Sequence, residues 1–435
     1  MAPRLDFTSE AFFRDPPTAI AALRAQGPVV ATRFPLVGDV WITTTHDATA
    51  QVLKDSTIFT LRKEDGEVAG LRWWMPGLVR TIANNMLTTD EPDHTRLRSI
   101  VDEAFRRRAI VAMEPRIRAI ADGLADELFA DGSPADLVER YARILPLSVI
   151  SELLGLPMAD RPRFIAWANA MSTLTNVVSF FRLLFAFRNM RSYLEGQLRI
   201  ARERGGEGLI AELVQVEREG GEITPDEMVS MVFLLLAAGS ETTTHLISGS
   251  VYELLRNPDM LDWMEQDWSR ASLAVEEFLR FVSPVQFSKP RYVRRDVEIE
   301  GVRVKKGDRV MVMLAAANMD PAVHEQPKRL NLERKPNRHI SFGTGIHFCL
   351  GHQLARIEGA CALQALFTRW PRLGLAVDPS QIRWRKRPGL RAIAKLPVIA
   401  SDGQPVDLRE ATRSRSQPNT ERPSRSGEAS RSPAI

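Results

Sequence analysis

The chain has 435 residues, of which 44% are hydrophobic and 26% are charged, the composition of a globular protein with a sizeable core. Its net charge of +4 is too small to indicate a nucleic-acid-binding protein, and its two cysteines exclude a disulfide framework. No apolar run approaches the roughly 20 residues that a membrane-spanning helix needs, and the N-terminus lacks a signal-peptide core. We therefore expect a cytoplasmic protein with no membrane anchor and no nucleic-acid partner.

The N-terminal part of the chain predicts a short helix, a β-hairpin and a second helix. Helical periodicity occurs around Pro17–Ala25. Val29–Phe34 and Val40–Thr44 have the composition of two strands on either side of a Gly-Asp turn. His46–Lys54 again indicates a helix.

The segment from Arg62 to Leu87 has no clean period, although it contains large apolar residues that include Trp73, Trp74 and Leu78. An irregular segment of this composition either packs as a loop on the core or covers a binding site. The residues by themselves favour the two interpretations equally.

A helix predicted at Pro92–Phe105 places His94 and Arg98 four residues apart on one face. Such a face is commonly a solvated polar surface, although an arginine that binds in a bidentate manner suits a carboxylate removed from water. The three arginines Arg106–Arg108 follow directly. They are either a solvated helix end or a docking surface for an acidic electron donor.

Further helical segments lead to the centre of the chain, and one of them, Asn176–Phe187, is apolar enough for a buried helix. The others are Val111–Phe129, Asp136–Leu154, Asp160–Met171, Tyr193–Arg204 and Leu209–Gly220.

The longest predicted helix runs from Pro225 to Arg256. Thr224 is its N-cap and Glu227 completes a capping box, while the dipeptide Asn-Pro after Arg256 ends the helix. At the rise of an α-helix this length gives about 45 Å, enough to cross a domain of this size.

The middle of this helix, Ala237–Thr244, breaks the rules of helix composition. It combines small residues with the acid Glu241 and with β-branched hydroxyl residues, among them Thr242. Because a buried charge is costly, the segment is either a functional site or a packing notch that leaves Glu241 exposed.

A shorter helix and several extended segments follow. The helix Ser272–Phe281 carries Glu277 and Arg280 three residues apart, a pair that is common on protein surfaces. The extended segments are Pro284–Phe287, Arg291–Asp296, Val297–Val304 and Arg309–Met313.

The stretch Phe342–Gly351 combines three glycines with Cys349, and a helix that ends near Trp370 follows it. The glycines let the backbone approach a flat partner, and the helix start would point N–H groups at the sulfur and favour a thiolate. A single thiolate does not describe a zinc or iron–sulfur site, but it suits an axial ligand of haem iron. The other cysteine, Cys361, has the spacing of a core residue.

The pattern Phe342-x-x-Gly345-x-His347-x-Cys349-x-Gly351 resembles the haem-binding loop of the cytochromes P-450, the haem-thiolate monooxygenases. Weaker motifs precede it in the order that is typical of this family: Pro-x-His-x-x-x-Arg, Ala-Gly-x-Glu-Thr, Glu-x-x-Arg, and an arginine before a strand.

The resemblance implies a mainly α fold with a smaller β-rich part, in which the haem lies between the long central helix and the helix after the cysteine loop. It points to the bacterial type without a membrane tether. We expect residues 1–400 to form a single domain and residues 401–435, which are rich in Ser, Arg and Pro, to be a disordered tail.

The resemblance also implies the residues of the site. Cys349 would be the axial ligand of the iron in heme b (iron protoporphyrin IX). Glu241 and Thr242 would be the catalytic residues, which feed protons to bound dioxygen. The side chains expected to bind the haem propionates are His94, Arg98, Arg291 and His347.

Other segments receive roles from the same resemblance. The segment 62–87 would roof the substrate pocket, the apolar helix near residue 180 would be its lid, and Gln286 would face the substrate. Glu277 and Arg280 would form a structural cluster with Arg329. The apolar pocket residues would be Trp73, Trp74, Leu78, Phe180, Leu234, Ala237 and Phe287.

The implied reaction is hydroxylation, or a related oxidation, of a small apolar molecule by dioxygen. A separate ferredoxin and ferredoxin reductase would donate the electrons, and the protein would be a monomer. Two alternatives stay open: a haem-thiolate peroxygenase or rearrangement enzyme, and a haem-binding sensor without turnover. Glu241-Thr242 argues against the first because such enzymes tend to lack that pair, whereas only substrate conversion separates the second.

Overall fold

The computed structural model describes residues 6–35, 37–64, 66, 68, 85–102, 105–172, 177–387 and 389–400, without the side chains of residues 107, 168–172, 177–181 and 183. Several predictions therefore lie outside the described residues. They are the roof over the pocket with Trp73, Trp74 and Leu78, the side chain of Phe180, and the tail 401–435.

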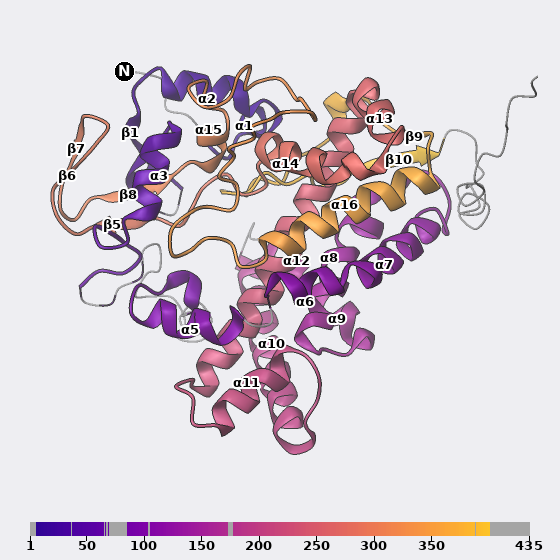
Figure 1. Ribbon diagram of the computed structural model, residues 1–435, viewed down its shortest axis with the longest axis horizontal. Helices are drawn as coiled ribbons and strands as arrows, with labels where there is room; N and C mark the ends of the chain where they lie inside the picture. Colours follow the sequence, from indigo (N-terminus) through magenta and orange to yellow (C-terminus); the bar gives the residue numbers. More distant parts are fainter. Residues whose placement is uncertain are drawn as a thin grey trace, which may run out of the picture.

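Helices make up most of the molecule (Figure 1). They are α1 (Glu10–Arg14), α2 (Pro16–Arg24), α3 (His46–Lys54), α5 (Asp93–Asp102), α6 (Arg107–Ala112), α7 (Glu114–Glu127), α8 (Ile144–Leu154), α9 (Arg161–Ser172), α10 (Val177–Arg204), α11 (Leu209–Arg218), α12 (Pro225–Arg256), α13 (Pro258–Glu265), α14 (Ala271–Val282), α15 (Leu314–Asn318) and α16 (His352–Arg369).

The strands are short and gather mainly at one side of the molecule, beside α3 (Figure 1). They are β1 (Val29–Phe34), β2 (Gly38–Thr43), β3 (Phe59–Thr60), β4 (Ala135–Asp136), β5 (Arg291–Val293), β6 (Val297–Ile299), β7 (Val302–Val304), β8 (Arg309–Val312), β9 (Leu373–Leu375) and β10 (Pro397–Ala400).

The main sheet joins segments that are far apart in the chain. Its strand order is β1-β2-β8-β5-β3, and β2 pairs with β8 in parallel while the other pairs are antiparallel. The hairpin β1–β2 has Val29 opposite Thr43 and Phe34 opposite Gly38. The sheet therefore fixes β5, which begins at Arg291, against the N-terminal part of the chain.

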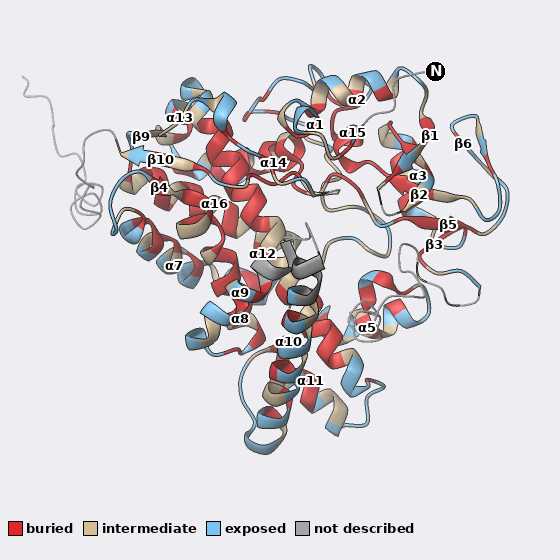
Figure 2. Cartoon of the chain, turned by 180° about the vertical axis from the view of Figure 1, so that it is seen from behind, coloured by how far each residue is buried: buried red, intermediate tan, exposed pale blue. Residues whose placement is uncertain are grey.

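The central helix α12 begins and ends where the sequence predicts. The Thr224 hydroxyl accepts the Glu227 N–H at 3.2 Å, and the Glu227 carboxylate accepts the Thr224 N–H at 2.8 Å, which completes the capping box. The helix is buried along most of its length and packs against α8, α14 and α16 (Figure 2). It lies behind α16 as the central element of the helical part (Figure 1).

Three helix predictions differ from the structure in their boundaries. The segment Val111–Phe129 is two helices, because Pro115 starts α7 and cannot continue α6. Asp136 belongs to a strand that pairs with β10, so the next regular α-helix begins only at Ile144. The described part of the predicted segment Asn176–Phe187, from Val177 on, belongs with Tyr193–Arg204 to one helix, α10, because the polar residues between them are compatible with a helix.

The buried cluster around Glu277 and Arg280 forms as predicted, but its third member is Arg334 and not Arg329. Glu277 Oε1 lies 2.7 Å from Arg280 Nη2, and Glu277 Oε2 lies 3.0 Å from Arg334 Nε. Arg329 is exposed and contributes only its carbonyl oxygen, which accepts a hydrogen bond from Arg280 at 3.2 Å. The loop that returns after residue 330 decides which arginine faces the carboxylate.

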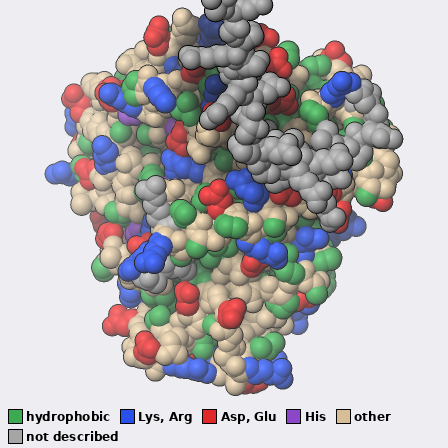
Figure 3. All heavy atoms as spheres, turned by 45° about the vertical axis from the view of Figure 1, so that its right-hand side comes forward, with side chains coloured by type: hydrophobic (Ala, Val, Ile, Leu, Met, Phe, Trp, Pro, Cys, Tyr) green, Lys and Arg blue, Asp and Glu red, His purple; other side chains and the backbone are tan. Residues whose placement is uncertain are grey.

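In the part of the chain that the structure describes, no helix combines the length and apolar character that crossing a membrane requires. On the face in Figure 3, basic and acidic side chains are interspersed over the surface. That mixed face agrees with the small net charge of +4.

Candidate functional site

The loop before α16 is shaped by two glycines with positive φ. Gly343 has φ 70° and Gly345 has φ 75°, conformations that residues with a Cβ rarely adopt. A Cβ on Gly345 would also clash with the carbonyl oxygen of Leu53 at the end of α3. The loop closes with a hydrogen bond of 2.9 Å from the Cys349 N–H to the Phe342 carbonyl. These constraints hold the cysteine at the start of the helix, as the spacing of the glycines predicts.

The Cys349 sulfur lies in a strongly desolvated position. Burial raises the pKa of its thiol, and this effect outweighs the hydrogen bond from the Gly351 N–H, which lowers it. The helix start therefore lowers the pKa of the thiol, as expected, but in the protein alone burial raises this pKa by more. A thiolate here needs a cationic partner, and a metal ion is one that deprotonates a coordinating thiol.

A cavity of about 1350 Å³ opens between the cysteine loop and α12. Cys349 and Leu354 line one side of it, and Ala238 and Thr242 of α12 line another. Pockets for a single small ligand commonly measure roughly 300–1,000 Å³. The cavity therefore has room for a cofactor together with a small molecule.

The four side chains predicted to bind propionates all line this cavity, and three have buried nitrogens without a hydrogen-bond partner in the described residues. These atoms are His94 Nδ1, which lies 3.6 Å from Glu91 Oε1, Arg291 Nε and His347 Nε2. The rings of His94 and His347 lie 4.3 Å apart. Unpaired buried donors are costly, so an acceptor group from a ligand would satisfy them.

Burial sets the charge state of these nitrogens. It lowers the pKa of Arg291 to about 10, so this arginine stays charged at neutral pH. Burial, with a further contribution from Arg291, lowers the pKa of His347 to about 3, so this histidine is neutral and its ring can donate one hydrogen bond. Arg98 donates to the Phe348 carbonyl at 2.7 Å and so ties α5 to the cysteine loop. These four side chains fit a ligand whose carboxylates are buried. A haem, with its two propionates, is such a ligand.

On α12, the small residues and Thr242 face the cavity as predicted. The Thr242 hydroxyl donates to the Ala238 carbonyl at 2.7 Å within the helix. Gly239 allows close packing with α8, since a Cβ there would lie 3.1 Å from Cγ1 of Ile150. The unusual composition of the helix centre thus serves both the packing of α8 and the wall of the cavity.

Glu241 is not among the residues that line the cavity. It forms an ion pair with Arg387, which comes from the segment before β10, and its Oε1 lies 3.9 Å from His245 Nε2. Burial raises the pKa of Glu241, but His245 and Arg387 outweigh it and leave this pKa lowered. The carboxylate is therefore ionised, and it is paired with a cavity-lining arginine that the sequence analysis did not single out.

The predicted substrate-facing residues divide into two groups. Leu234 and Phe287 line the cavity, whereas Ala237 and Gln286 do not. Gln286 points into the protein, and both polar atoms of its side-chain amide lack partners in the described residues. Gln286 and Phe287 are neighbours on an extended segment, so their side chains face opposite ways and only one of them can reach the cavity.

Glu358 is a buried residue of the cavity wall that the sequence analysis missed. It lies on α16 and is 1% exposed. Burial raises the pKa of its carboxyl to about 8, and the nearby Thr243 hydroxyl offsets only part of this effect. Its spacing with Leu354 and Cys361 could have placed it on the buried face of the predicted helix.

Three comparisons relate the chain to known proteins. A family model described as Cytochrome P450 matches residues 198–371. The vitamin D(3) 25-hydroxylase of Pseudonocardia autotrophica is 39% identical over 399 residues, which cover 90% of this chain and 96% of that protein. The cytochrome P450 monooxygenase PikC of Streptomyces venezuelae is 36% identical over 396 residues, or 89% and 91% of the two chains.

Solved structures are similar over the same extent. The myxobacterial cytochrome P450 CYP267B1, solved in complex with myristic acid, has 36% identity and a TM-score of 0.83, and the match covers 91% of this chain and 98% of that one. The cytochrome P450 PksS of the Bacillus subtilis 168 bacillaene polyketide synthase has 36% identity and a TM-score of 0.82, with 91% and 100% covered. The range matched by the family model, residues 198–371, includes Thr242 and Cys349 of the cavity lining.

Proposed function

The chain belongs to the cytochrome P450 family of haem-dependent monooxygenases, and from that premise we propose that Cys349 is the axial ligand of a heme b iron. The observation that carries the proposal is the position of Cys349 in the wall of a cavity that Thr242 of α12 also lines. The second cysteine, Cys361, is 1% exposed and packed in the core. Only Cys349 combines access to the cavity with a loop fixed by Gly343 and Gly345.

We propose that His94, Arg98, Arg291 and His347 bind the two propionates. The support is the presence of all four side chains in the cavity lining and the three buried nitrogens, on His94, Arg291 and His347, that have no hydrogen-bond partner in the described residues. Arg291 contributes a full charge, and the histidines contribute N–H donors.

The overall reaction converts the substrate C–H bond, dioxygen, two electrons and two protons into C–OH and water. When bound, the haem supplies the activation of dioxygen. The chain supplies the protons: we propose that the Thr242 hydroxyl, which lines the cavity, would turn from the Ala238 carbonyl, hold its proton toward the cavity and regain a proton from the solvent side. Glu241 would relay those protons after leaving its ion pair with Arg387.

The apolar part of the cavity supports a small apolar substrate. Leu234, Leu246, Phe287 and Leu390 contribute aliphatic and aromatic surface. Such walls orient a hydrocarbon body by shape and exclude water from the site of reaction. The relatives have names that refer to vitamin D(3) and polyketide biosynthesis, and one structure contains myristic acid, all of which are largely hydrocarbon ligands.

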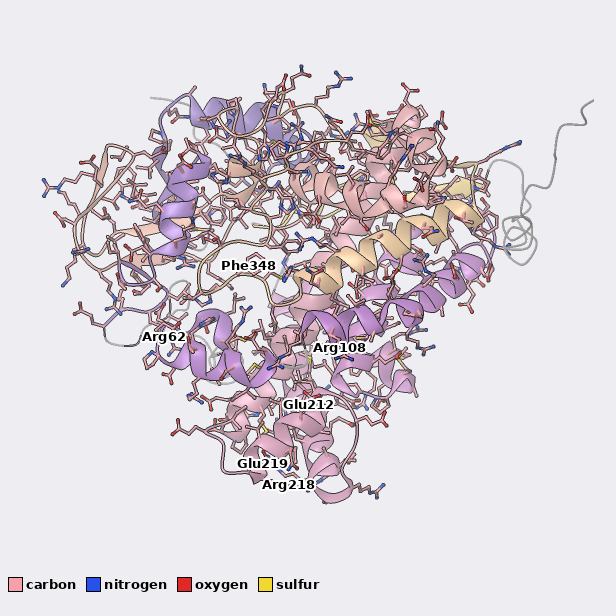
Figure 4. All side chains as sticks on the ribbon, in the orientation of Figure 1. Arg62, Arg108, Glu212, Arg218, Glu219 and Phe348 are labelled. Carbon is pink, nitrogen blue, oxygen red and sulfur yellow. The ribbon has the colours of Figure 1, made fainter. Side chains whose placement is uncertain are left out.

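We propose that the electrons come from a ferredoxin, which a ferredoxin reductase reduces, and that the protein works as a monomer in the cytoplasm. The docking surface would be the outer side of the cysteine loop, where Phe348 is 37% exposed beside Cys349 (Figure 4). The helix α6, which carries Arg108, packs against α16 (Figure 4). Exposed arginines near an exposed aromatic residue suit an acidic donor, since complementary charge steers the encounter.

We further propose that the residues up to about 400 form one domain. The support is the main sheet, in which β1 and β2 near the N-terminus pair with β8, whose last residue is Val312. A sheet assembled from such distant segments cannot form in half of the chain.

The alternative of a peroxide-dependent or rearrangement enzyme is less well supported than the monooxygenase. Thr242 lines the cavity, and the relatives include proteins named as a monooxygenase and as hydroxylases. A sensor without turnover would need the same haem contacts. A monooxygenase converts a substrate with a reducing system and not with peroxide alone. This measurement separates it from the peroxide-dependent or rearrangement enzyme and from the sensor.

Replacement of Cys349 by alanine tests the ligand assignment. We expect Cys349→Ala to abolish the absorbance band of the reduced, carbon-monoxide-bound protein that gives the family its name, because the thiolate is lost. The matched control is Cys361→Ala, which removes the buried cysteine and should leave the band at the same wavelength. A band that persists in Cys349→Ala would contradict the proposal.

A further inference from the structure

One lysine in the cavity wall has no partner that explains its charge. Lys289 lies on the extended segment between Phe287 and β5, and it lines the same cavity as Cys349. Phe287 and Arg291, two residues before and two residues after Lys289, line the cavity as well. A cation therefore follows directly after the apolar wall that Phe287 provides.

Protein atoms surround Lys289 on most sides, although its side chain keeps accessible surface. It is among the exposed residues, yet burial by surrounding protein lowers its pKa, and Arg387 lowers it further. A side chain that keeps accessible surface and is nevertheless surrounded by protein is one that points into a cavity. Within the described part of the chain, Lys289 forms no ion pair, and its ammonium group has no hydrogen-bond partner.

The cavity as a whole is cationic. Its described lining contains seven Lys and Arg residues but only two Glu residues: Arg98, Lys289, Arg291, Arg385, Lys386, Arg387 and Lys395 against Glu139 and Glu358. The carboxyl of Glu358, with a pKa of about 8, is mostly neutral at pH 7. The two propionates of a haem would offset only two of the positive charges.

The arginines near Lys289 already have partners. Arg387 is paired with Glu241, and Arg385 Nη2 lies 3.9 Å from Glu139 Oε1. Arg291 has no ion pair in the described residues either, but it is assigned to a propionate. Lys289 is thus a further cation whose charge those residues leave uncompensated, in a desolvated position where an unpaired charge is costly. Lys386 and Lys395 are exposed and extend the positive field along the cavity lining, which steers an anion inward.

We propose that the substrate is an amphipathic carboxylate, whose carboxylate binds Lys289 and whose hydrocarbon chain lies along the apolar wall toward Thr242. This inference rests on the proposed monooxygenase function and names the substrate class of that same site. Val285 and Leu390, which pair in an isolated β-bridge, form part of the apolar wall next to the lysine. The charged end would fix the distance of the chain from Cys349 and so select the carbon that is oxidised.

Lys289 has one competing role. Arg291 lies two residues further along the segment, so Lys289 could instead hold a haem propionate. In that case its removal would weaken haem binding and leave the affinity for any substrate unchanged. The two roles therefore differ in a measurable way.

The test compares charged and uncharged ligands of equal length on the haem-loaded protein. The probes are the n-alkanoates from octanoate to hexadecanoate and the corresponding n-alkanols, titrated by the change in haem absorbance and by calorimetry. In the wild type we expect the best alkanoate to bind at least about tenfold more tightly than the matching alkanol, a difference of about 1.4 kcal/mol. Lys289→Met should remove this preference and leave the affinity for the alkanol unchanged.

Lys305→Met is the matched control, because Lys305 is exposed beside the β6–β7 hairpin and does not line the cavity. It should keep the preference for the alkanoate. Equal binding of alkanoate and alkanol to the wild type, or binding of neither at any chain length, would overturn the proposal. A Lys289→Met protein that loses haem but keeps the preference would assign the lysine to a propionate instead. Absence of the carbon monoxide band from the wild type would refute the proposed function, whereas a normal band without the preference would refute the carboxylate alone.

Discussion

Single residues around the cavity owe their charge states to burial more than to their neighbours. Desolvation raises the pKa of the Cys349 thiol even though a backbone N–H of the helix start points at the sulfur. It makes His347 neutral, with a pKa of about 3, and it holds a proton on Glu358, with a pKa of about 8. The three residues come from one loop and one helix, and all three are uncharged at neutral pH for the same physical reason.

Glu358 gives a test of this account through the pH dependence of stability. Its folded pKa of about 8 lies above the ordinary value of 4.5. The stabilisation is therefore fully present below about pH 4.5, and it is lost as the pH rises toward 8, because the unfolded state ionises first. We expect Glu358→Gln, which cannot ionise, to unfold with a free energy roughly 1–3 kcal/mol higher than the wild type at pH 7.5.

Chemical denaturation of the haem-loaded protein at pH 5 and pH 7.5 measures this difference. At pH 5 the free energies of unfolding of the wild type and of Glu358→Gln should differ by much less than at pH 7.5. Glu333→Gln, at an exposed position, is the control and should follow the wild type at both values. A Glu358→Gln protein whose stability changes with pH as much as that of the wild type would show that the carboxyl is ionised in the fold.

At the scale of elements, the helix α12 connects local sequence signals to the site. Its N-terminus is fixed by Thr224 and Glu227, and Glu227 Oε1 also binds Arg96 Nη2 of α5 at 2.6 Å. The cap therefore anchors α12 to the helix that carries His94 and Arg98. A long helix that starts at a defined residue places Thr242 at a defined height in the cavity.

Loss of the cap should weaken the start of α12. We expect Thr224→Ala to lower the free energy of unfolding by about 1 kcal/mol, because the N–H of Glu227 loses its acceptor. Thr224→Ser keeps the hydroxyl and should lie close to the wild type. Urea unfolding followed by circular dichroism measures all three proteins. An equal loss in the alanine and serine variants would mean that the methyl group, and not the cap, is responsible.

At the scale of the whole molecule, the cluster around Glu277 joins α14 to the long loop before the cysteine. The Glu277 carboxylate contacts Arg280 and Arg334, and it also accepts hydrogen bonds from Asn331 and Asn337. Arg280 in turn donates to carbonyl groups of this loop. Both Glu277 and Arg280 are fully buried, so the cluster depends on every member.

Removal of one charge from this cluster should be far more damaging than removal of a surface charge. We expect Glu277→Gln to cost about 3–5 kcal/mol in the free energy of unfolding, because Arg280 and Arg334 remain buried without a carboxylate. Glu10→Gln breaks the exposed pair of Glu10 with Arg14 and should cost about 1 kcal/mol or less. Denaturant titrations with haem absorbance and circular dichroism as probes compare the two. Similar small losses in both variants would contradict the structural role of the cluster.

The sequence by itself determined the elements whose signals are local. The strand Val29–Phe34 and the helices His46–Lys54 and Pro225–Arg256 have the predicted boundaries. Caps, turns and positive φ angles act between residues a few positions apart, so they are visible without a fold. The spacing of glycines and cysteine in the loop before α16 likewise indicated the family, which the relatives confirmed.

Only the tertiary structure decided which distant residues meet. It paired Glu277 with Arg334 in place of Arg329, paired Glu241 with Arg387, and left Lys289 uncompensated in the cavity wall. In each case the partner, or its absence, depends on how a loop folds back over many residues. Burial then sets the cost of a charge, and burial is a property of the packed molecule that no local pattern of residues contains.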